Sequence, residues 1–577
     1  MKPFIKRPLV RLAKHLSLWQ QVVHQQTLLE MARQRLLVAS GLMLVGFLVI
    51  MGRLVDVMAL RSHSPISHTS IVHQLDIPRS DIIDRNGEVL ATHIITASVY
   101  ANPKVILNPR EAADKLAKVL PDVGSETLYQ RLCSQKGFVW LARHIPPKLQ
   151  HEINKMGIPG IYLQKDYRRV YPYGRMTSHI LGYCGIDNKG LSGVEKFFDI
   201  KLHNDKTPLK LSIDIRVQHI VHDELVNAVD TFQAMAANAM VMDIKTGEIL
   251  AMVSIPNFDP NLPNQNKPED SFNRNTLGVY ECGSVFKVLN ITIALESHTA
   301  THASCYDATQ PVRIGRFKIT DFKGQNRQLT LAEAFVYSSN IAAIKIAQQF
   351  GMETQKKFFE KLGLFKPATV EIPEIGHPFI PNPWTPVTTM SAAYGYGIAV
   401  SPLQIFTAIS TVINEGYKIQ PTLLLQEEVP PAREEVKILS TKTSKMILDL
   451  MRTAVRDGTA KQANVAGYLV FGKTGTAYRA KGRHGYGNNK TRTNSFIGGF
   501  PYHKPRYMVM VTLEDPKALP STYGYATAGW NAAPTAGKMI ARMAPILGVQ
   551  PIHDEQEIKE PVVPGWVSVK NTTEPNQ

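Results

Sequence analysis

Cysteine is scarce in this chain. Only Cys133, Cys184, Cys282 and Cys305 occur among 577 residues, and no two of them have C-x-x-C spacing. Four cysteines are too few to predict a disulfide scaffold. We therefore interpret all four as small buried residues, the usual place of an unpaired cysteine.

Nucleic-acid-binding patterns are also missing. The chain has 65 basic and 48 acidic residues and a net charge of +17, a balance that by itself would permit binding to nucleic acid. No zinc-finger, basic-zipper or RNP-type pattern accompanies that charge. The 44% hydrophobic and 20% charged content is typical of a folded protein, and the length predicts about three or four domains.

Acidic residues are nearly absent from residues 1–35, which contain one acidic residue, Glu30, and seven lysines and arginines. Seventeen uncharged residues follow, Leu36–Gly52, closed by Arg53. A buried core helix and a cleaved signal peptide are alternatives to a membrane span, but this run ends in M-G-R-L-V-D rather than in a small-x-small cleavage site. We expect an uncleaved anchor over 36–53 with a cytoplasmic basic tail over 1–35. The remaining residues then lie outside the cytoplasm, which argues against a nucleic-acid partner.

The stretch after the anchor predicts an N-terminal domain over 54–208. The polar residues 61–69 are typical of a linker. Alternating apolar positions flank Asn86-Gly87, a dipeptide that favours a β-hairpin. Residues 110–156 look helical, interrupted by F-V-W-L-A-R-H-I-P-P, and 157–199 are rich in Gly, Tyr and Arg. We expect a mixed, mostly extended module without a catalytic set.

A second domain is predicted over 209–547. A strand passes into a helix near 209–218, and strands are expected at 237–243 and 248–255. Helical periodicity dominates from 284 to about 458, and strands return at 469–478, 495–500 and 507–514. Two early and three late strands predict one sheet assembled from both ends of an α/β (α+β) domain. Residues 548–577 are weakly hydrophobic and predict a flexible tail.

The most informative stretch is Y-E-C-G-S-V-F-K at 280–287. We expect Ser284 to begin a helix, in which Ser284 and Lys287 lie on one face. A serine hydroxyl is a weak nucleophile until a base takes its proton, and a buried, neutral lysine can be that base. The pattern S-x-x-K is short and arises by chance, so this interpretation depends on the rest of the chain.

Two later stretches supply what such a nucleophile needs. Thr330 and Glu333 predict a capping box for a helix that ends near 337, and Ser338-Ser339-Asn340 then forms the joint before a second helix. A plain turn is the alternative for this joint. Ser338 could carry protons in the cleft, and Asn340 could hold a peptide group.

The other stretch is Lys473-Thr474-Gly475-Thr476, expected on a strand. A glycine within a strand often marks the close approach of a ligand or of another backbone, and a peptide substrate lying along this strand would need such clearance. Lys473 would attract a carboxylate and help to keep Lys287 neutral. A second K-T-G, at 245–247, lies in a predicted hairpin before the nucleophile, and we assign it to turn chemistry.

In this order, the three motifs resemble those of the penicillin-binding transpeptidases. R-S-D-I-I-D-R-N-G-E-V-L-A, R-V-Y-P-Y-G-R, G-L-S-G-V-E and M-D-I-K-T-G-E-I-L-A-M-V-S are similar to stretches of the class B members. F-V-W-L-A-R-H-I-P-P, Y-E-C-G-S and D-G-T-A-K-Q-A-N-V-A-G-Y resemble the division-specific branch; the elongation-specific branch stays open. The resemblance covers about residues 36–545. It departs from the family at Cys282, where many relatives have proline, and at 393–397, A-Y-G-Y-G.

The resemblance implies a fold and a reaction. The fold is an antiparallel five-stranded sheet flanked by helices, preceded by an extended class B pedestal, or dimerisation-like, domain. The reaction is D-Ala-D-Ala transpeptidation through a serine acyl-enzyme. The implied catalytic residues are Ser284, Lys287, Ser338, Asn340 and Lys473; Thr474, Gly475 and Thr476 would bind substrate, and the backbone N–H groups of Ser284 and Thr476 would form the oxyanion hole.

The resemblance also implies partners and a location. The partners are peptidoglycan stem peptides, β-lactam antibiotics, an FtsW-type glycosyltransferase and other divisome proteins. The catalytic domain would be periplasmic, anchored in the bacterial inner membrane, with neither metal nor organic cofactor. A β-lactam hydrolase or sensor and a non-catalytic septal scaffold are the alternatives, although no E-x-x-L-N stretch follows the second motif to supply a deacylating glutamate.

Overall fold

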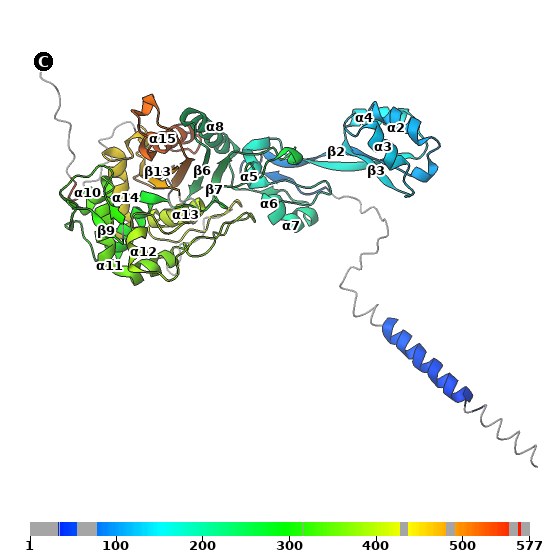
Figure 1. Cartoon of the computed structure of the whole chain (residues 1–577), viewed down its shortest axis with the longest axis horizontal. Helices are drawn as coiled ribbons and strands as arrows, with labels where there is room; N and C mark the ends of the chain where they lie inside the picture. Colours follow the sequence, from blue (N-terminus) through cyan, green and yellow to red (C-terminus); the bar gives the residue numbers. More distant parts are fainter. Residues whose placement is uncertain are drawn as a thin grey trace, which may run out of the picture. The chain divides into compact units, whose positions relative to one another are not determined.

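The computed structural model describes residues 33, 35–54, 78–315, 317–426, 437–479, 491–552 and 563–566. The predicted linker over 61–69 and nearly all of the predicted basic tail lie outside these residues. Contacts divide the chain into two units, 1–75 and 76–577, which are described separately (Figure 1).

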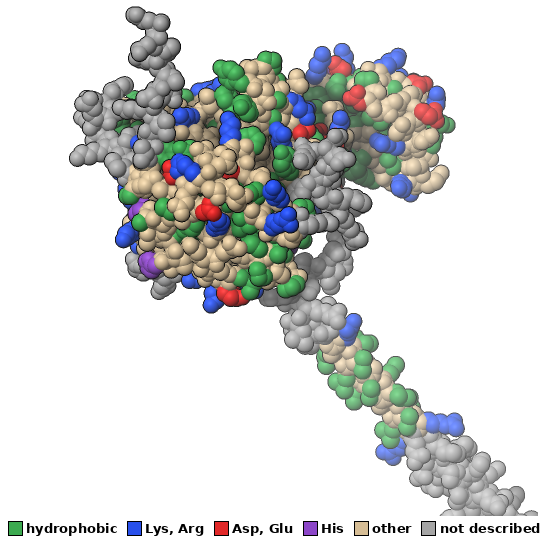
Figure 2. All heavy atoms as spheres, turned by 60° about the vertical axis from the view of Figure 1, so that its left-hand side comes forward, with side chains coloured by type: hydrophobic (Ala, Val, Ile, Leu, Met, Phe, Trp, Pro, Cys, Tyr) green, Lys and Arg blue, Asp and Glu red, His purple; other side chains and the backbone are tan. Residues whose placement is uncertain are grey.

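The first unit contains one apolar helix, Arg35–Leu54, of 20 residues with a mean hydropathy of 2.1. Its hydrophobic side chains are exposed along its length, with basic side chains near both ends (Figure 2). At 1.5 Å per residue the helix is about 30 Å long, the thickness of a bilayer's hydrocarbon core. The predicted N-terminal apolar helix is confirmed, and its length and exposure are consistent with a single-pass membrane anchor.

The N-terminal part of the second unit is built on the long strand β2 (Val89–Ala101). The predicted hairpin at Asn86-Gly87 is confirmed, because β1 (Ile82–Ile83) pairs antiparallel with the start of β2. Farther along, β2 pairs antiparallel with β3 (Val139–Ile145) and with β4 (Ile161–Val170), while β5 (Leu209–Lys210) joins β1 in parallel. The F-V-W-L-A-R-H stretch that interrupts the helical pattern is therefore a strand.

Six helices accompany these strands. Three of them pack their apolar side chains with those of β2 and β3: α2 (Pro109–Ala117), α3 (Ser125–Leu132) and α4 (Pro147–Lys155). The shorter ones are α5 (Ser178–Leu181), α6 (Gly193–Phe197) and α7 (Asp199–Asn204).

A buried ion network joins three motif stretches of this region. The carboxylate of Glu195, from G-L-S-G-V-E, accepts hydrogen bonds from Arg79 Nε at 3.0 Å and from Arg169 Nε at 2.6 Å. The side chains of Arg79 and Glu195 are fully buried. A buried carboxylate is tolerated only when it is paired and hydrogen-bonded, and two guanidinium groups meet that requirement here.

The C-terminal part contains the predicted sheet of five antiparallel strands, ordered β12-β13-β14-β6-β7. Its strands are β6 (Ala236–Asp243), β7 (Ile249–Ile255), β12 (Phe471–Tyr478), β13 (Arg492–Phe500) and β14 (Tyr507–Glu514). Strands from the two ends of the domain meet where β14 pairs with β6, with Val509 opposite Val241. The prediction of one sheet assembled from both ends is confirmed.

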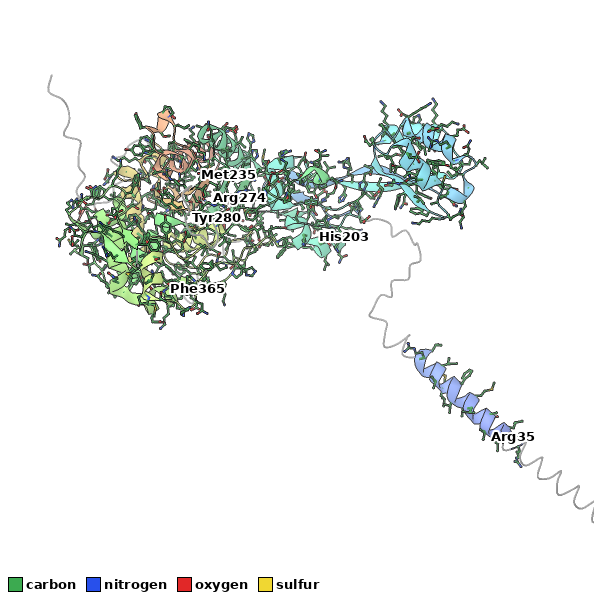
Figure 3. The ribbon with its side chains drawn as sticks, viewed as in Figure 1. Arg35, His203, Met235, Arg274, Tyr280 and Phe365 are labelled. Carbon is green, nitrogen blue, oxygen red and sulfur yellow. The ribbon has the colours of Figure 1, made fainter. Side chains whose placement is uncertain are left out.

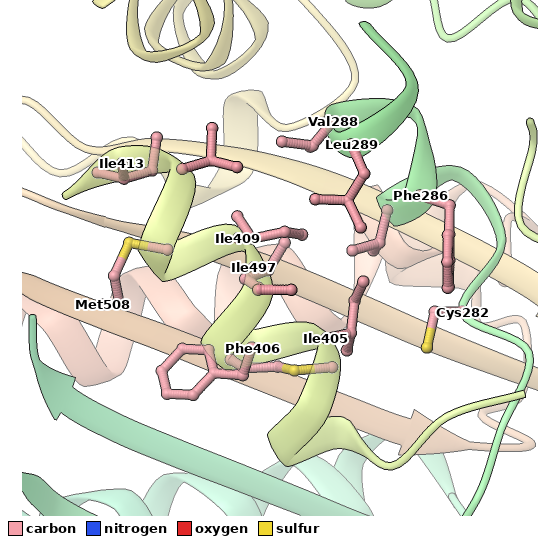
Figure 4. Close-up of a cluster of buried hydrophobic side chains, with 14 of the residues drawn as sticks. Cys282, Phe286, Val288, Leu289, Ile405, Phe406, Ile409, Ile413, Ile497 and Met508 are labelled. Carbon is pink, nitrogen blue, oxygen red and sulfur yellow. The ribbon is translucent and has the colours of Figure 1, made fainter. Parts of the chain in front are cut away.

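Helices cover both faces of this sheet. On one face α8 (Ile215–Phe232) and α15 (Ala532–Met543) pack against Val241, Val509 and their neighbours. On the other face α13 (Pro402–Ile413) packs between α9 (Phe286–Glu296) and the strands, with Phe406 and Ile409 close to Ile497 and Met508 (Figure 4). The remaining helices are α10 (Leu331–Val336), α11 (Asn340–Lys361), α12 (Pro386–Ala392) and α14 (Thr441–Arg456).

Two expectations need correction. Helices were expected to dominate from 284 to about 458, but this range also holds two antiparallel pairs: β8 (Cys305–Asp307) with β11 (Gln328–Thr330), and β9 (Val312–Ile314) with β10 (Phe317–Ile319). Cys133 and Cys305 are exposed, Cys184 is half-buried and only Cys282 is fully buried. The burial expected for all four is therefore wrong for the two exposed thiols, which lie at the end of α3 and on the short strand β8.

Candidate active site

The first motif lies in a 3₁₀ turn, Gly283–Val285, that leads into α9. Ser284 was expected to begin the helix, but it lies inside the turn; Cys282 is the N-cap of the turn and Val285 that of α9, and neither makes a side-chain capping bond. The turn instead leaves the hydroxyl facing Lys287, one turn further on, with Nζ 3.1 Å from Ser284 Oγ. Because Lys287 is buried with nearly all of α9 while Ser284 is partly exposed, this pair lies at the edge of the hydrophobic core.

The loop before the nucleophile is fixed from two sides. The backbone of Tyr280 pairs with that of Val400, N to O at 2.9 Å and O to N at 3.0 Å. The Tyr280 hydroxyl donates to Glu514 Oε1 at 2.8 Å, and Arg274 Nε lies 3.4 Å from the same oxygen. Figure 3 labels Arg274 and Tyr280 in this part of the fold. The carboxylate at the end of β14 therefore ties the approach to Ser284 to the sheet.

The second motif is a turn between α10 and α11. The predicted capping box at Thr330 and Glu333 is present, and Ser339 caps α11 by accepting the N–H of Ala342. Between the two helices Ser338 has a φ of 61°. A residue with a side chain is strained there and holds that conformation only when its surroundings impose it.

Asp321 supplies much of that constraint, and sequence reasoning missed it. Its Oδ1 accepts the backbone N–H groups of Asn340 at 2.6 Å and Ile341 at 3.1 Å, and its Oδ2 accepts the hydroxyl of Ser339 at 2.6 Å. A carboxylate at a helix N-terminus is favoured by the helix dipole and by the free N–H groups there. Asp321 stands 17 residues before Ser338, outside any motif, so no local pattern points to it.

The amine of Lys287 lies at the centre of the cluster. Nζ is 2.6 Å from Ser338 O, 2.7 Å from Asn340 Oδ1, 3.2 Å from Ser338 Oγ and 3.1 Å from Ser284 Oγ. The carbonyl and the amide oxygen can only accept, so they take two N–H groups. The third position of the amine then faces the two hydroxyls, either of which can donate to it when the amine is neutral.

The electrostatics favour that neutral form. Lys287 is 1% exposed, and desolvation holds the pKa of its amine well below its usual range, with a further lowering by Lys473 and an opposing contribution from Asp321. The predicted influence of Lys473 on Lys287 therefore has the expected direction, although burial is the larger cause.

Asn340 is engaged within the protein at both ends of its amide. Its Oδ1 accepts from Lys287, and its Nδ2 donates to Thr320 O at 3.0 Å. The amide oxygen therefore orients Lys287, and the expected hold on a substrate peptide group stays a prediction. The bond to Thr320 uses one of the two N–H groups of Nδ2, so the other can still donate to a substrate.

The third motif lies on β12, the edge strand of the sheet. Lys473 Nζ donates to Ser338 Oγ at 2.9 Å, so all three motifs meet around one hydroxyl. Lys473 is fully buried, and desolvation lowers the pKa of its amine to about 7. An anionic ligand beside this amine would favour its charged form, which couples the protonation of Lys473 to substrate binding.

Gly475 serves a purpose other than the one expected. A Cβ at this position would lie 2.7 Å from Cys282 O and 2.7 Å from Val285 Cγ2. The clearance on β12 is therefore occupied by the chain's own nucleophile turn rather than left free for a peptide substrate. The same approach brings Gly283 beside Thr476 O, at 2.7 Å from an added Cβ, so the turn that carries Ser284 packs directly against Thr476.

The threonines of the third motif are held by neighbours that the sequence did not single out. Thr474 Oγ1 lies 2.8 Å from the hydroxyl of Thr459, and Thr476 Oγ1 accepts the backbone N–H of Ala528 at 3.2 Å. Since that bond occupies a lone pair of Thr476, its own O–H is free to donate to a ligand. The second K-T-G lies, as expected, in the turn between β6 and β7, where Thr246 donates to Glu248 at 3.1 Å.

Known families cover most of the chain. Residues 237–540 match the model of the penicillin-binding protein transpeptidase domain, and residues 75–207 match that of the penicillin-binding protein dimerisation domain. A peptidoglycan synthetase from Bifidobacterium adolescentis has the same fold, with a TM-score of 0.66 at 19% identity over 85% of this chain and 98% of that one.

Curated relatives match along the same length. A probable peptidoglycan D,D-transpeptidase FtsI of Caulobacter vibrioides is 34% identical over 82% of each chain. Stage V sporulation protein D of Bacillus subtilis is 30% identical over 86% of this chain and 82% of its own. The peptidoglycan D,D-transpeptidase FtsI of Escherichia coli is 28% identical over 83% and 85%. The chain therefore belongs to the class B penicillin-binding proteins, with their dimerisation and transpeptidase domains.

Proposed function

We propose that this protein is a serine D,D-transpeptidase that cross-links peptidoglycan stem peptides ending in D-Ala-D-Ala, and that β-lactams inactivate it. One observation carries the proposal: a lysine amine, 1% exposed, lies 3.1 Å from the Ser284 hydroxyl while two carbonyl-type oxygens take its N–H groups. The names and domains of the relatives support the substrate class.

The acylation step follows from this geometry. Lys287 accepts the proton of Ser284 as Oγ attacks the carbonyl of the penultimate D-Ala. The backbone N–H groups of Ser284 and Thr476 stabilise the oxyanion, as a preorganised donor pair does. The proton then passes through Ser338, whose hydroxyl lies within 3.2 Å of both lysine amines, to the leaving D-Ala amine. An amine of a neighbouring stem peptide resolves the acyl-enzyme and completes the cross-link.

The third motif binds the terminal carboxylate of the stem peptide. The ammonium of Lys473 supplies the charge, and the hydroxyls of Thr474 and Thr476 donate hydrogen bonds. Asn340 binds a substrate amide through the second N–H of Nδ2, while the first keeps its bond to Thr320. A penicillin presents a carboxylate and a strained carbonyl to the same groups, and its acyl-enzyme is then trapped.

Location and pathway complete the proposal. The anchor over 36–53 leaves the tail over 1–35 in the cytoplasm and the domains over 54–208 and 209–547 in the periplasm. The similarity to FtsI relatives supports a role at the division septum, with an FtsW-type glycosyltransferase and other divisome proteins as partners.

The chain offers a matched control for the test, because it contains two K-T-G stretches. Purified full-length protein in detergent is incubated with nascent peptidoglycan, and cross-linked stem peptides and released D-Ala are measured. Lys473→Ala and Ser284→Ala should abolish both products, and Lys245→Ala should preserve both. Cross-linking by Ser284→Ala at the unaltered rate would refute the assignment.

The alternatives give different results in related assays. A β-lactam hydrolase would turn over penicillin rapidly instead of retaining one equivalent. If the protein were a non-catalytic scaffold, its Ser284→Ala variant would still restore division to a strain depleted of the wild-type protein.

A further inference from the structure

A short segment near the C-terminus packs against the helix that leads into the second motif and against the turn that follows α14. Residues 548–577 were expected to form a flexible tail, yet Val563–Trp566 has a defined place, with Val563 5% exposed in the main hydrophobic core. Of the C-terminal residues after Ile552, these four are the ones that the structure describes.

The sequence V-P-G-W explains the shape of this segment. The N–H of Trp566 donates to Val563 O at 3.0 Å, which closes a four-residue turn. Proline suits the second position of a type II turn, and the third position needs a positive φ, which glycine adopts freely. Gly565 has a φ of +81°, and a Cβ there would lie 3.1 Å from Thr330 Cβ. The turn points Val563 into the core and brings Trp566 to the surface of α10.

The turn touches both ends of α10, the helix that leads into Ser338. At the start of α10, the hydroxyl of Thr330 accepts the N–H of Glu333 in the capping box and donates its own proton to Gly565 O at 2.7 Å. At the other end, the ring of Trp566 packs against Tyr337, with centroids 5.3 Å apart. Tyr337 immediately precedes the strained Ser338.

Trp566 also reaches the element beside the third motif. Its indole Nε1 donates to Asp457 Oδ2 at 2.8 Å. Asp457 follows α14 and lies two residues before Thr459, whose hydroxyl is 2.8 Å from that of Thr474. A Cβ on the intervening Gly458 would lie 2.8 Å from Val336 Cγ1, so α10 and this turn are packed together beneath Trp566.

We propose that the turn Val563–Trp566 is a clamp that holds the Ser338 turn against the Thr459–Thr474 contact, and that Trp566 is a positioning residue for acylation. The inference rests on the proposed function of the same site. The clamp touches no substrate. It acts by fixing Tyr337 and Asp457, and through them the hydroxyls of Ser338 and Thr474.

Two truncations of the full-length protein test the clamp. One chain ends after Val562 and lacks the turn; its matched control ends after Trp566 and lacks only residues 567–577. Stopped-flow acylation by a fluorescent penicillin separates the non-covalent dissociation constant from the acylation rate constant. A misplacement of about 1 Å at a catalytic group can cost up to about 100-fold in rate, so we expect the shorter chain to acylate at least about tenfold more slowly than its control.

A merely structural role gives a different signature. It would lower the fraction of protein that can be labelled, whereas the clamp lowers the acylation rate constant of protein that still labels completely. Trp566→Phe, which keeps the ring on Tyr337 but loses the N–H, should lie between wild type and Trp566→Ala. If the shorter chain does not fold, the full-length Trp566→Ala protein decides the question on the same rate constant.

Equal acylation rate constants for the two truncations, or for Trp566→Ala and wild type, would overturn the clamp. Failure of the proposed function is distinguishable from this result, because wild-type protein would then take no label at Ser284. A synthetic peptide spanning 561–568 provides a further check: added to the shorter chain, it should restore part of the rate.

Discussion

Replacing Lys473 by methionine should stabilise the protein while abolishing its activity. The side chain is fully buried, and burial lowers the pKa of its amine from 10.5 to about 7. Each pKa unit corresponds to about 1.36 kcal/mol. Burying the charged amine at pH 6 therefore lowers the free energy of unfolding by up to about 5 kcal/mol. Loss of the bond to Ser338 Oγ offsets about 1–2 kcal/mol. We expect Lys473→Met to be about 3 kcal/mol more stable than wild type at pH 6.

The pH dependence separates the charge on Lys473, together with its effect on the pKa of Lys287, from those effects of the substitution that do not vary with pH. Because the folded-state pKa is depressed, the penalty is complete below pH 7, shrinks as pH rises towards 10.5 and vanishes above it. The difference in the free energy of unfolding between Lys473→Met and wild type should therefore fall by about 3 kcal/mol between pH 6 and pH 9. Urea unfolding of full-length protein in detergent measures it, with Lys245→Met as the exposed control. An advantage that is equal at both pH values, or a variant less stable than wild type at pH 6, would refute the reasoning.

Three further predictions concern the surroundings of the nucleophile. Asp321→Asn removes a charge that raises the pKa of Lys287, so the rising limb of acylation rate against pH should move to lower pH; a shift to higher pH would contradict this. Gly475→Ala places a Cβ 2.7 Å from Cys282 O and should slow fluorescent-penicillin acylation at least about tenfold, since a backbone atom cannot yield as a side chain can. Burial raises the pKa of the Cys282 thiol to about 12, so a maleimide should spare it in folded protein, and Cys282→Ala should keep its acylation rate within about twofold if its role is structural.

The arrangement of the sheet could be predicted because each strand carries its own local signal. Two hydrophobic runs lie before the nucleophile and three lie after residue 469, and few arrangements other than one sheet bury both faces of all five. The strand β6, for example, is buried at every residue. The capping box at Thr330 and the hairpin at Asn86-Gly87 are equally local. Each depends on residues within four positions of one another, the range over which sequence patterns are informative.

Contacts between distant residues could not be predicted in the same way. Asp321 reaches the Ser338 turn only because the β9–β10 pair and the loop after it fold back on α11. The clearance at Gly475 looks like a substrate groove in the sequence, and only the three-dimensional path of 282–285 shows what fills it. The turn at 563–566 did carry a signal, Pro-Gly between two apolar residues, but the polar composition around it favoured a tail.

The most direct test of the account is to map the residue that penicillin acylates and to ask what controls its rate. Full-length protein is labelled with a penicillin, digested and analysed by mass spectrometry, in parallel with Ser284→Ala and Lys287→Met. The account predicts a single adduct on Ser284 in wild type, none in Ser284→Ala, and an acylation rate reduced at least about 100-fold in Lys287→Met. An adduct on another residue, or undiminished acylation of Ser284 without the Lys287 amine, would contradict it.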